Sequence, residues 1–228
     1  MKEWKFDEGE VLLFDKPFDW SSFDLVKKVK NSIKKLAGKN VKVGHAGTLD
    51  PYATGLLILC TGKATKTIES IQDQYKTYSG TIKLGATTAS YDLESDPDTF
   101  YPIDHITDDL LLSTAKSFIG EQDQLPPIFS AKMIDGKRAY ELARKGETPV
   151  MNPKKIEIYD FDIHRISEDE LKFVVKCSKG TYIRSLAHDL GRALQSGAYL
   201  SSLRRDGIGE YSLSNAYTIE SFKQTLEG

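Results

Sequence analysis

The sequence predicts an α+β fold, and three features of its apolar patterning support that class. Strand-like and helix-like patterns follow one another without the regular alternation of a doubly wound sheet. Residues 154–163 and 170–178 read as two successive strands joined by a polar turn. No internal repeat or low-complexity linker occurs. We therefore expect a sheet flanked by helices.

The amino-terminal part predicts a strand followed by a helix. The segment "VLLFDKP" at 11–17 is a short buried strand that Pro17 stops. Residues 21–38 form a helix, in which Ser21 and Asp24 have capping-box spacing and Gly38 marks the end. Its predicted core positions are Val26, Val29, Ile33 and Leu36, which leaves the lysines mostly on the outer face.

The middle of the chain predicts strands at 55–60 and 75–85. Residues 86–106 are polar and acid-rich, and we expect a long loop or insertion there. A helix follows at 107–120, with acids in its first turn and a glycine at its end. Residues 124–146 hold a Pro126–Pro127 corner and then a short basic helix.

The last third contains the clearest helix of the sequence. Ile183, Leu186, Ala187, Leu190 and Leu194 recur at the spacing of one helix face. Residues 199–213 predict loop and strand, and the tail predicts at most a strand and a short helix.

The composition suits one large domain or a domain with a small appendage. The chain has 228 residues, a net charge of −2, and no apolar run near the ~18 residues of a membrane span. Its acidic start does not resemble a signal peptide, so we expect a cytoplasmic protein with no membrane contact. Two cysteines and four scattered histidines give no metal-binding spacing.

Although the net charge is close to zero, the chain contains two strongly charged segments of opposite sign. Seven lysines and no acid lie between Val26 and Leu49, whereas seven acids and no lysine or arginine lie between Asp92 and Asp109. Such polarity can steer a polyanion to one face. A solvated helix face and an acidic loop would give the same pattern.

Nucleotide-binding and hydrolase motifs are absent. "GLLILCTGKAT" separates its glycines by six residues where a phosphate-binding loop needs four, and Ala64 replaces the required Ser or Thr. Neither GxGxxG nor GxSxG occurs.

The remaining candidate is a lone carboxylate, Asp50, in "VKVGHAGTLDPYATG". Glycines at 44, 47 and 55 permit unusual backbone conformations and leave room for a substrate. Pro51 fixes the turn after Asp50. Such an aspartate can act as nucleophile or base if a cation orients it, and Arg184 is the candidate by residue type. An aspartate that merely closes a glycine-rich turn is the alternative.

The complete set of motifs resembles a known family. The motifs are "LLFDKPFDWSSFDLV", "KVGHAGTLDPYATGLLILCTGKATK", "KTYSGTIKLG", "PPIFSAKMIDGKRAYELARKG" and "CSKGTYIRSLAHDLG…YLSSLRR". Across residues 9–211, in the same order, they resemble the bacterial TruB-type tRNA pseudouridine(55) synthases. The resemblance is to a short form that lacks the C-terminal PUA-like domain.

The resemblance implies a fold and an activity. The fold is the pseudouridine synthase fold, with a mixed, mainly antiparallel central sheet flanked by helices and RNA-binding insertions. Residues 1–228 would form a single catalytic domain, with 212–228 as a short tail. The enzyme would flip uridine 55 out of the T-loop of tRNA and isomerise it after attack by Asp50, with no cofactor, no metal and no obligate protein partner.

The resemblance also assigns roles to individual residues. Tyr78 would stack on the target base, Arg184 would pair with Asp50, and Tyr182 and Asp92 would line and brace the pocket. His45 would lie beside the extruded nucleotide, and Leu203 would be an apolar pocket residue. Candidates for RNA-backbone contact are Lys132, Lys137, Arg138, Arg144 and Lys145. Ala89 stands where the family commonly has an aspartate, which makes the bracing role of its segment less secure.

Two other functions remain open at this stage. One is a guide-RNA-dependent relative of the archaeal and eukaryotic type. The sequence of the motif "HAGTLDPYATG" argues against it. The other is a tRNA-binding chaperone with secondary catalysis. The motifs leave open the oligomeric state, the range of tRNAs, and whether Asp50 attacks the sugar or the base.

Overall fold

The computed structural model describes residues 4–130, 132–134, 136–143, 145–147 and 149–227. The chain divides into two compact units, one formed by residues 1–78 with 203–228 and the other by residues 79–202. Strands β4 (Lys76–Leu84) and β12 (Ala198–Ile208) run from one unit into the other. The single catalytic domain expected over 1–228 stays a prediction.

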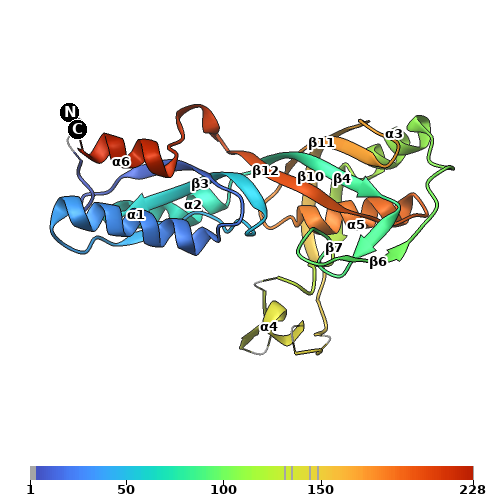
Figure 1. The fold of residues 1–228 in the computed structure, drawn as a ribbon, viewed down its shortest axis with the longest axis horizontal. Helices are drawn as coiled ribbons and strands as arrows, with labels where there is room; N and C mark the ends of the chain where they lie inside the picture. Colours follow the sequence, from blue (N-terminus) through green and yellow to red (C-terminus); the bar gives the residue numbers. More distant parts are fainter. Residues whose placement is uncertain (1–3, 131, 135, 144, 148, 228) are drawn as a thin grey trace. The chain divides into compact units, whose positions relative to one another are not determined.

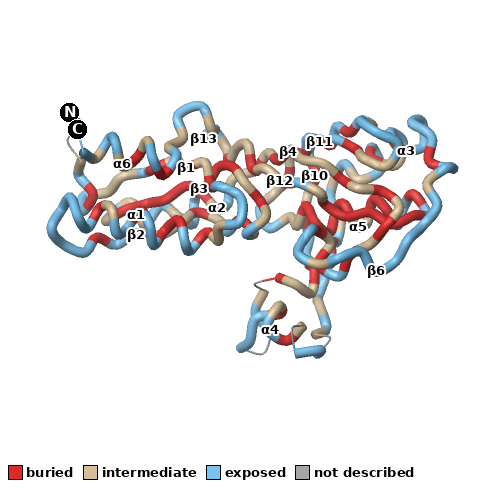
Figure 2. Tube along the Cα trace, viewed as in Figure 1, coloured by how far each residue is buried: buried red, intermediate tan, exposed pale blue. Residues whose placement is uncertain are grey.

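The first unit is built on β3 (Ala53–Thr61), which is almost wholly buried (Figure 2). β1 (Val11–Lys16) and β2 (Val43–His45) pair with β3 in antiparallel fashion, whereas β12 pairs with it in parallel. The sheet is therefore mixed, as the sequence predicted. The short strand β13 (Tyr211–Ser212) extends it beside β12.

Helix α1 (Ser22–Ala37) covers this sheet with its apolar side (Figure 1). The predicted capping box is present, with Asp24 in the place that Glu usually takes, and Gly38 ends the helix in the left-handed region at φ +67°. Val26, Val29 and Ile33 are buried as expected. Leu36 is 50% exposed, so that prediction was wrong: the apolar cluster ends one turn earlier.

The carboxyl-terminal segment belongs to the core of the first unit. After the end of β13 at Ser212 it contains a 3₁₀ turn, η2 (Leu213–Asn215), and helix α6 (Ile219–Glu227), so the predicted short helix of the tail is present. Phe222 of α6 meets Phe14 of β1 edge to face, with the ring centroids 5.1 Å apart. Burial of Phe222 contributes about 2 kcal/mol or more. Between β3 and β4 lie η1 (Gly62–Thr67) and α2 (Ile68–Gln72).

The second unit has the strand order β12–β4–β11–β10–β7. β11 (Glu170–Cys177), β10 (Lys154–Arg165) and β7 (Gly120–Gln124) are antiparallel neighbours. Helix α3 (Asp108–Ser117) packs on β10, and α5 (Ile183–Ala193) is the amphipathic helix predicted from the sequence (Figure 1). The α+β class is confirmed.

Three of these predictions were wrong, and in two of them, at β7 and at β12, pairing with a distant strand decides the structure. The acid-rich stretch 86–106 contains a hairpin of β5 (Ala86–Thr88) and β6 (Pro97–Phe100). Gly120 opens strand β7 rather than capping the preceding helix. Residues 198–208 form the continuous strand β12 where a loop was expected first.

The segment between β7 and β10 holds the expected short helix, α4 (Ala139–Ala143), together with a small hairpin of β8 (Met133–Ile134) and β9 (Lys137–Arg138). Throughout the described part of the chain, no helix is both long enough and apolar enough to span a membrane.

Candidate active site

Asp50 lies on a tight turn between β2 and β3. Its carbonyl oxygen accepts a hydrogen bond from the backbone N–H of Ala53 at 3.1 Å, and Pro51 occupies the second position of this turn, where its fixed φ is favoured. The side chain of Asp50 is half-buried. The predicted role of Pro51 in fixing the turn therefore agrees with the structure.

The residue before Asp50 is anchored to the start of α1. The hydroxyl of buried Ser22 accepts a hydrogen bond from the N–H of Leu49 at 2.8 Å and lies 3.0 Å from the carbonyl oxygen of the same residue, to which it donates. Both backbone groups of Leu49 are thus satisfied by one side chain. The chain entering the turn has little freedom to shift.

The residue after Asp50 is held by Lys16, at the end of β1. Its buried ammonium group donates to the carbonyl oxygens of Pro17 at 3.0 Å, Trp20 at 2.5 Å and Pro51 at 3.1 Å. Burial lowers the pKa of Lys16 to about 8, and the negative charge of Asp50 is the largest influence opposing that change. Lys16 is therefore a cation that acts on Asp50 from within the same unit.

A second buried cation, Arg205 of β12, holds the other side of the loop. Its guanidinium group donates to the carbonyl oxygens of Gly47 at 3.0 Å, Thr48 at 3.3 Å and Leu56 at 2.8 Å. Arg205 is 1% exposed. The planar guanidinium group, whose donors have fixed geometry, thereby links the backbone just before Asp50 to strand β3 just after it.

Sequence reasoning missed both Lys16 and Arg205. For Lys16 a signal existed: Leu12, Phe14 and Lys16 alternate along β1, and all three are buried. A lysine at the third buried position of such a strand must find acceptors inside the protein. For Arg205 the sequence carries no comparable signal, because its acceptors lie about 150 residues away in the chain.

The glycines of the loop act in a different way from the one expected. Gly47 (φ +97°) and Gly55 (φ +100°) do adopt backbone conformations that disfavour other residues. A Cβ on Gly55, however, would lie 2.3 Å from the carbonyl oxygen of Arg205, and one on Gly44 would lie 2.7 Å from the side chain of Ile68. At these two positions the space is taken by the chain itself rather than by a substrate.

The first unit also contains His45, Tyr78 and Leu203. His45 ends β2 and is half-buried, and its Nδ1 has no hydrogen-bonding partner among the described residues. Burial lowers its pKa, a backbone hydrogen bond at Gly47 opposes that change, and Arg205 adds to it, so the ring is neutral near pH 7. Tyr78 lies on β4 and is 9% exposed. Leu203 of β12 pairs with Ala53 of β3, and Ala53 is three residues after Asp50 in the chain.

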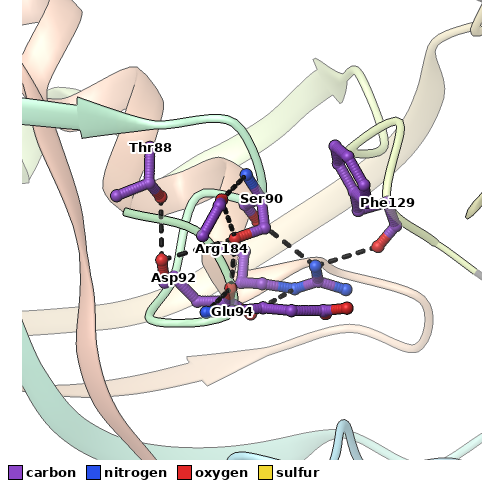
Figure 3. A network of polar contacts seen from close by, with 7 residues as sticks. Thr88, Ser90, Asp92, Glu94, Phe129 and Arg184 are labelled. Atoms are coloured by element: carbon purple, nitrogen blue, oxygen red, sulfur yellow. Dashed lines mark hydrogen bonds and ion pairs between the residues drawn. The ribbon is translucent and has the colours of Figure 1, made fainter. Parts of the chain in front are cut away.

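The second unit contains a buried ion pair between Arg184 and Asp92 (Figure 3). Arg184 Nε lies 3.6 Å from Asp92 Oδ2, and Nη1 donates to the carbonyl oxygens of Ser90 at 3.2 Å and Phe129 at 2.9 Å. These contacts join the first turn of α5 to the segment after β5 and to the residues after β7. Asp92 therefore braces Arg184.

The segment that carries Asp92 is stabilised by its own hydrogen bonds (Figure 3). Asp92 Oδ1 accepts from the Ser90 hydroxyl at 2.6 Å and from the Glu94 N–H at 3.0 Å, while Thr88 donates to the Asp92 carbonyl oxygen at 2.8 Å. Ala89 is exposed. The alanine at this position consequently leaves the network around Asp92 intact.

Tyr182 occupies the N-cap position of α5, where its backbone is clamped by Gln124. The Tyr182 N–H donates to Gln124 Oε1 at 2.8 Å, and its carbonyl oxygen accepts from Gln124 Nε2 at 3.0 Å. Asp50 belongs to the first unit and Arg184 to the second. The pairing of Asp50 with Arg184 stays a prediction.

The basic residues predicted to contact RNA lie in the segment between β7 and β10. Lys137 and Arg138 form β9 and are exposed, as is Lys145 after α4. The ammonium group of Lys132 donates to the carbonyl oxygen of Asn152 at 2.9 Å. Arg144 lies outside the described residues. Within the described part of the chain, no group of three or more His, Cys, Asp or Glu residues could hold a metal ion.

Comparison with known families adds to this geometry. Residues 34–183 match the model of the TruB family pseudouridylate synthase N-terminal domain, and residues 184–227 match that of the tRNA pseudouridylate synthase B C-terminal domain. The chain belongs to the TruB family.

Relatives within the TruB family match along nearly their whole length. The chain is 53% identical over 222 residues to tRNA pseudouridine synthase B of Flavobacterium johnsoniae, covering 96% of this chain and 97% of the relative. It is 51% identical over 223 residues to the protein of the same name from Phocaeicola vulgatus, covering 97% and 95%. The resemblance inferred from the motifs is confirmed.

Solved structures confirm the pseudouridine synthase fold. A chain in the crystal structure of a Cbf5–Nop10–Gar1 complex matches with a TM-score of 0.71 and 28% identity. A chain in the structure of an H/ACA ribonucleoprotein bound to a substrate RNA containing 2′-deoxyuridine matches with a TM-score of 0.68 and 25% identity. Each match covers 96% of the present chain but only 54% and 53% of the other chain.

Proposed function

We propose that this protein is a tRNA pseudouridine synthase that isomerises uridine 55 in the T-arm of tRNA. The observation that carries the proposal is the turn of Asp50, which Ser22, Lys16 and Arg205 hold from three different elements of the first unit. A loop fixed in this way presents one carboxylate in a defined position. Such preorganisation is what a single reacting group requires.

The chemistry needs no external reactant. The bond from C1′ to N1 of uridine breaks, the base turns, and a new bond joins C1′ to C5. The proton on C5 is lost and N1 ends protonated, so the product is an isomer of the substrate. Asp50 is the nucleophile in this proposal, and the bond that its carboxylate forms with the nucleoside breaks again before the product leaves, which restores the carboxylate. The positive charge of Lys16 favours its ionised form at neutral pH.

The target base must leave the T-loop before Asp50 can reach it. Base extrusion costs a few kcal/mol, which stacking and phosphate contacts offset. Tyr78 is our candidate for stacking on the base, and His45, with its neutral ring, for contact with the extruded nucleotide. Leu203 would supply apolar contact beside Asp50. The pocket roles of Tyr182, Arg184 and Asp92 remain proposals drawn from the family likeness.

The T-arm as the site of recognition and the lack of any obligate protein partner also belong to this proposal. Identities of 51–53% over nearly the whole length of two proteins named tRNA pseudouridine synthase B support an enzyme that acts on tRNA. The likeness to the chain from the Cbf5–Nop10–Gar1 complex is weaker, at 28% identity over about half of that chain. Exposed Lys137, Arg138 and Lys145 are candidates for contacts with the RNA backbone.

The test is single-turnover release of tritium from a T-arm hairpin that carries [5-³H]uridine at the target position. We expect release by the wild type and a loss of at least about 10⁴-fold with Asp50→Asn, which keeps the shape of the side chain but not its charge. Asp162→Asn is the matched control, because Asp162 is exposed on β10 of the second unit. Release that survives in Asp50→Asn would refute the assignment of Asp50.

A chaperone without catalysis would give a different result. Wild type and Asp50→Asn would then both bind the hairpin without releasing tritium. Mapping pseudouridine in tRNA incubated with the wild type tests the position: product at a uridine other than 55 would contradict the assignment of the T-loop.

A further inference from the structure

A groove of about 390 Å³ lies beside the first turns of α1, within the first unit. Its lining comes from the turn before the helix and from one face of the helix itself: Asp19, Trp20, Asp24, Lys27, Lys28 and Asn31. Apart from Trp20, whose carbonyl oxygen accepts a hydrogen bond from Lys16, none of these residues belongs to the site described above. We call it the α1 groove.

The helical spacing explains why these side chains share one face. Asp24, Lys27, Lys28 and Asn31 stand at i, i+3, i+4 and i+7, which is a single stripe of an α-helix. The buried residues Leu25, Val29 and Ile33 lie on the opposite side. Burial of that apolar side therefore forces the basic stripe outward.

The lysines of the groove are free to bind a ligand, whereas the carboxylate of Asp24 is already hydrogen-bonded. Asp24 is engaged by the helix cap, since its Oδ2 accepts from the Ser21 N–H at 3.0 Å and from the Ser21 hydroxyl at 2.5 Å. Lys27 and Lys28 are exposed, and neither forms an ion pair with another described residue. Two ammonium groups therefore face solvent from the groove.

The groove is directly connected to the turn of Asp50. The backbone N–H of Asp19 donates to the carbonyl oxygen of Pro51 at 3.0 Å, and the ammonium group of Lys16 joins the carbonyl oxygens of Trp20 and Pro51. One wall of the groove is thus bonded to the residue that follows Asp50. A molecule bound at Asp50 that extends from Pro51 toward Asp19 would therefore pass along this wall.

We propose that the α1 groove binds the RNA backbone next to the target uridine, with Lys27 and Lys28 contacting phosphates and the Trp20 indole contacting a base or ribose. The proposal rests on the proposed function, because it places the groove on the path of the same RNA. Two lysines suit a polyanion, an aromatic ring suits stacking on unpaired bases, and Asp19 can accept a hydrogen bond from a ribose 2′-hydroxyl. An acidic peptide would satisfy only the lysines.

The first experiment measures the affinity of a fluorescein-labelled T-arm hairpin by anisotropy across a salt series. We expect Lys27→Ala/Lys28→Ala to bind about tenfold more weakly at physiological salt and to lower the slope of log K against log salt by about two. Lys27→Arg/Lys28→Arg should bind within about twofold of the wild type, since arginine also contacts phosphates.

The matched control is Lys30→Ala/Lys42→Ala. Lys30 and Lys42 are also exposed lysines of the same basic segment, but they do not line the groove. Both double variants lose the same charge. Equal affinities and equal salt slopes for the two variants would overturn the proposal, because a general field effect would then explain all of the loss.

The second experiment separates binding at the groove from catalysis. Single-turnover rates measured against enzyme concentration should show a raised half-saturation concentration for Lys27→Ala/Lys28→Ala and an unchanged maximal rate. Whole tRNA should show the same loss of affinity as the hairpin. A loss seen with whole tRNA alone would overturn the placement of the groove beside the target uridine.

The outcomes also distinguish this inference from the proposed function. If the wild type forms no pseudouridine but the groove variant still loses affinity for the hairpin, the proposed activity fails and the RNA site stands. If the wild type forms pseudouridine and the groove variant binds as its control does, the activity stands and this inference fails.

Discussion

The ammonium group of Lys16 donates a hydrogen bond to the carbonyl oxygen of Pro51 at 3.1 Å, so a buried cation holds the residue that follows Asp50. The same group also binds two carbonyl oxygens of the turn before α1. One side chain therefore links the end of β1, the start of α1 and the turn of Asp50. Its replacement should affect both stability and catalysis.

Lys16→Met should destabilise the protein by about 3 kcal/mol at pH 7.5, because three carbonyl oxygens lose the buried ammonium group that donates to them. The pKa of Lys16 falls from 10.5 to about 8 on folding, so between these values the unfolded state binds more protons and the wild type gains stability as pH rises. The difference in free energy of unfolding between wild type and Lys16→Met should therefore grow by about 2 kcal/mol from pH 7.5 to pH 10. Urea unfolding at both pH values measures it, and a gap that narrows would contradict the lowered pKa.

Arg205→Gln should lower the catalytic rate about ten- to a hundredfold and the stability by about 3 kcal/mol, since three carbonyl oxygens around the loop lose a buried donor. Arg204→Gln is its control: Arg204 pairs with Asp15 at a partly exposed position, with Nη2 and Oδ2 2.7 Å apart. That change should cost about 1 kcal/mol and leave the rate within about threefold. Single-turnover rates and thermal unfolding measure both variants. Equal rate losses would argue against a specific bracing role for Arg205.

Gly55→Ala should destabilise the protein by about 3 kcal/mol or more. The substitution combines a backbone φ of +100° with a Cβ only 2.3 Å from the carbonyl oxygen of Arg205, so β3 and β12 would have to separate. Gly38 also has a positive φ, but no atom lies within 4 Å of a Cβ added there. Gly38→Ala should therefore lower the stability by only about 1 kcal/mol. Chemical denaturation of the two variants tests the difference. Similar losses would show that backbone conformation alone matters at Gly55.

Asp92→Asn should destabilise the second unit by about 3 kcal/mol, because it removes the carboxylate charge 3.6 Å from the buried Arg184 Nε. Asp96→Asn, an exposed acid of the same segment, should stay within about 0.5 kcal/mol of the wild type. Hydrogen exchange at the amides of α5 reports on this unit directly. If the two variants exchanged alike, the Asp92–Arg184 pair would contribute nothing to stability.

Local patterns in the sequence predicted most of the elements. The spacing of apolar residues located α1 and α5, the acids of its first turn indicated α3, and the cap residues Ser21, Asp24 and Gly38 located both ends of α1. These signals depend on neighbours within one or two turns. Among the elements that were missed, β7 and the first part of β12 depend on partner strands from elsewhere in the chain, whereas β5 and β6 pair with each other in a short hairpin.

The sequence by itself determined the α+β class, the family and the choice of Asp50 as the candidate nucleophile, because those depend on periodicity and on residue motifs that are read along the chain. Only the tertiary structure decided how Asp50 is held. Lys16, Ser22 and Arg205 reach its turn from three separate elements, and Asp92 reaches Arg184 across about 90 residues of chain. Hydrogen bonds between distant residues form once packing has buried their partners away from water, and no local pattern encodes that pairing.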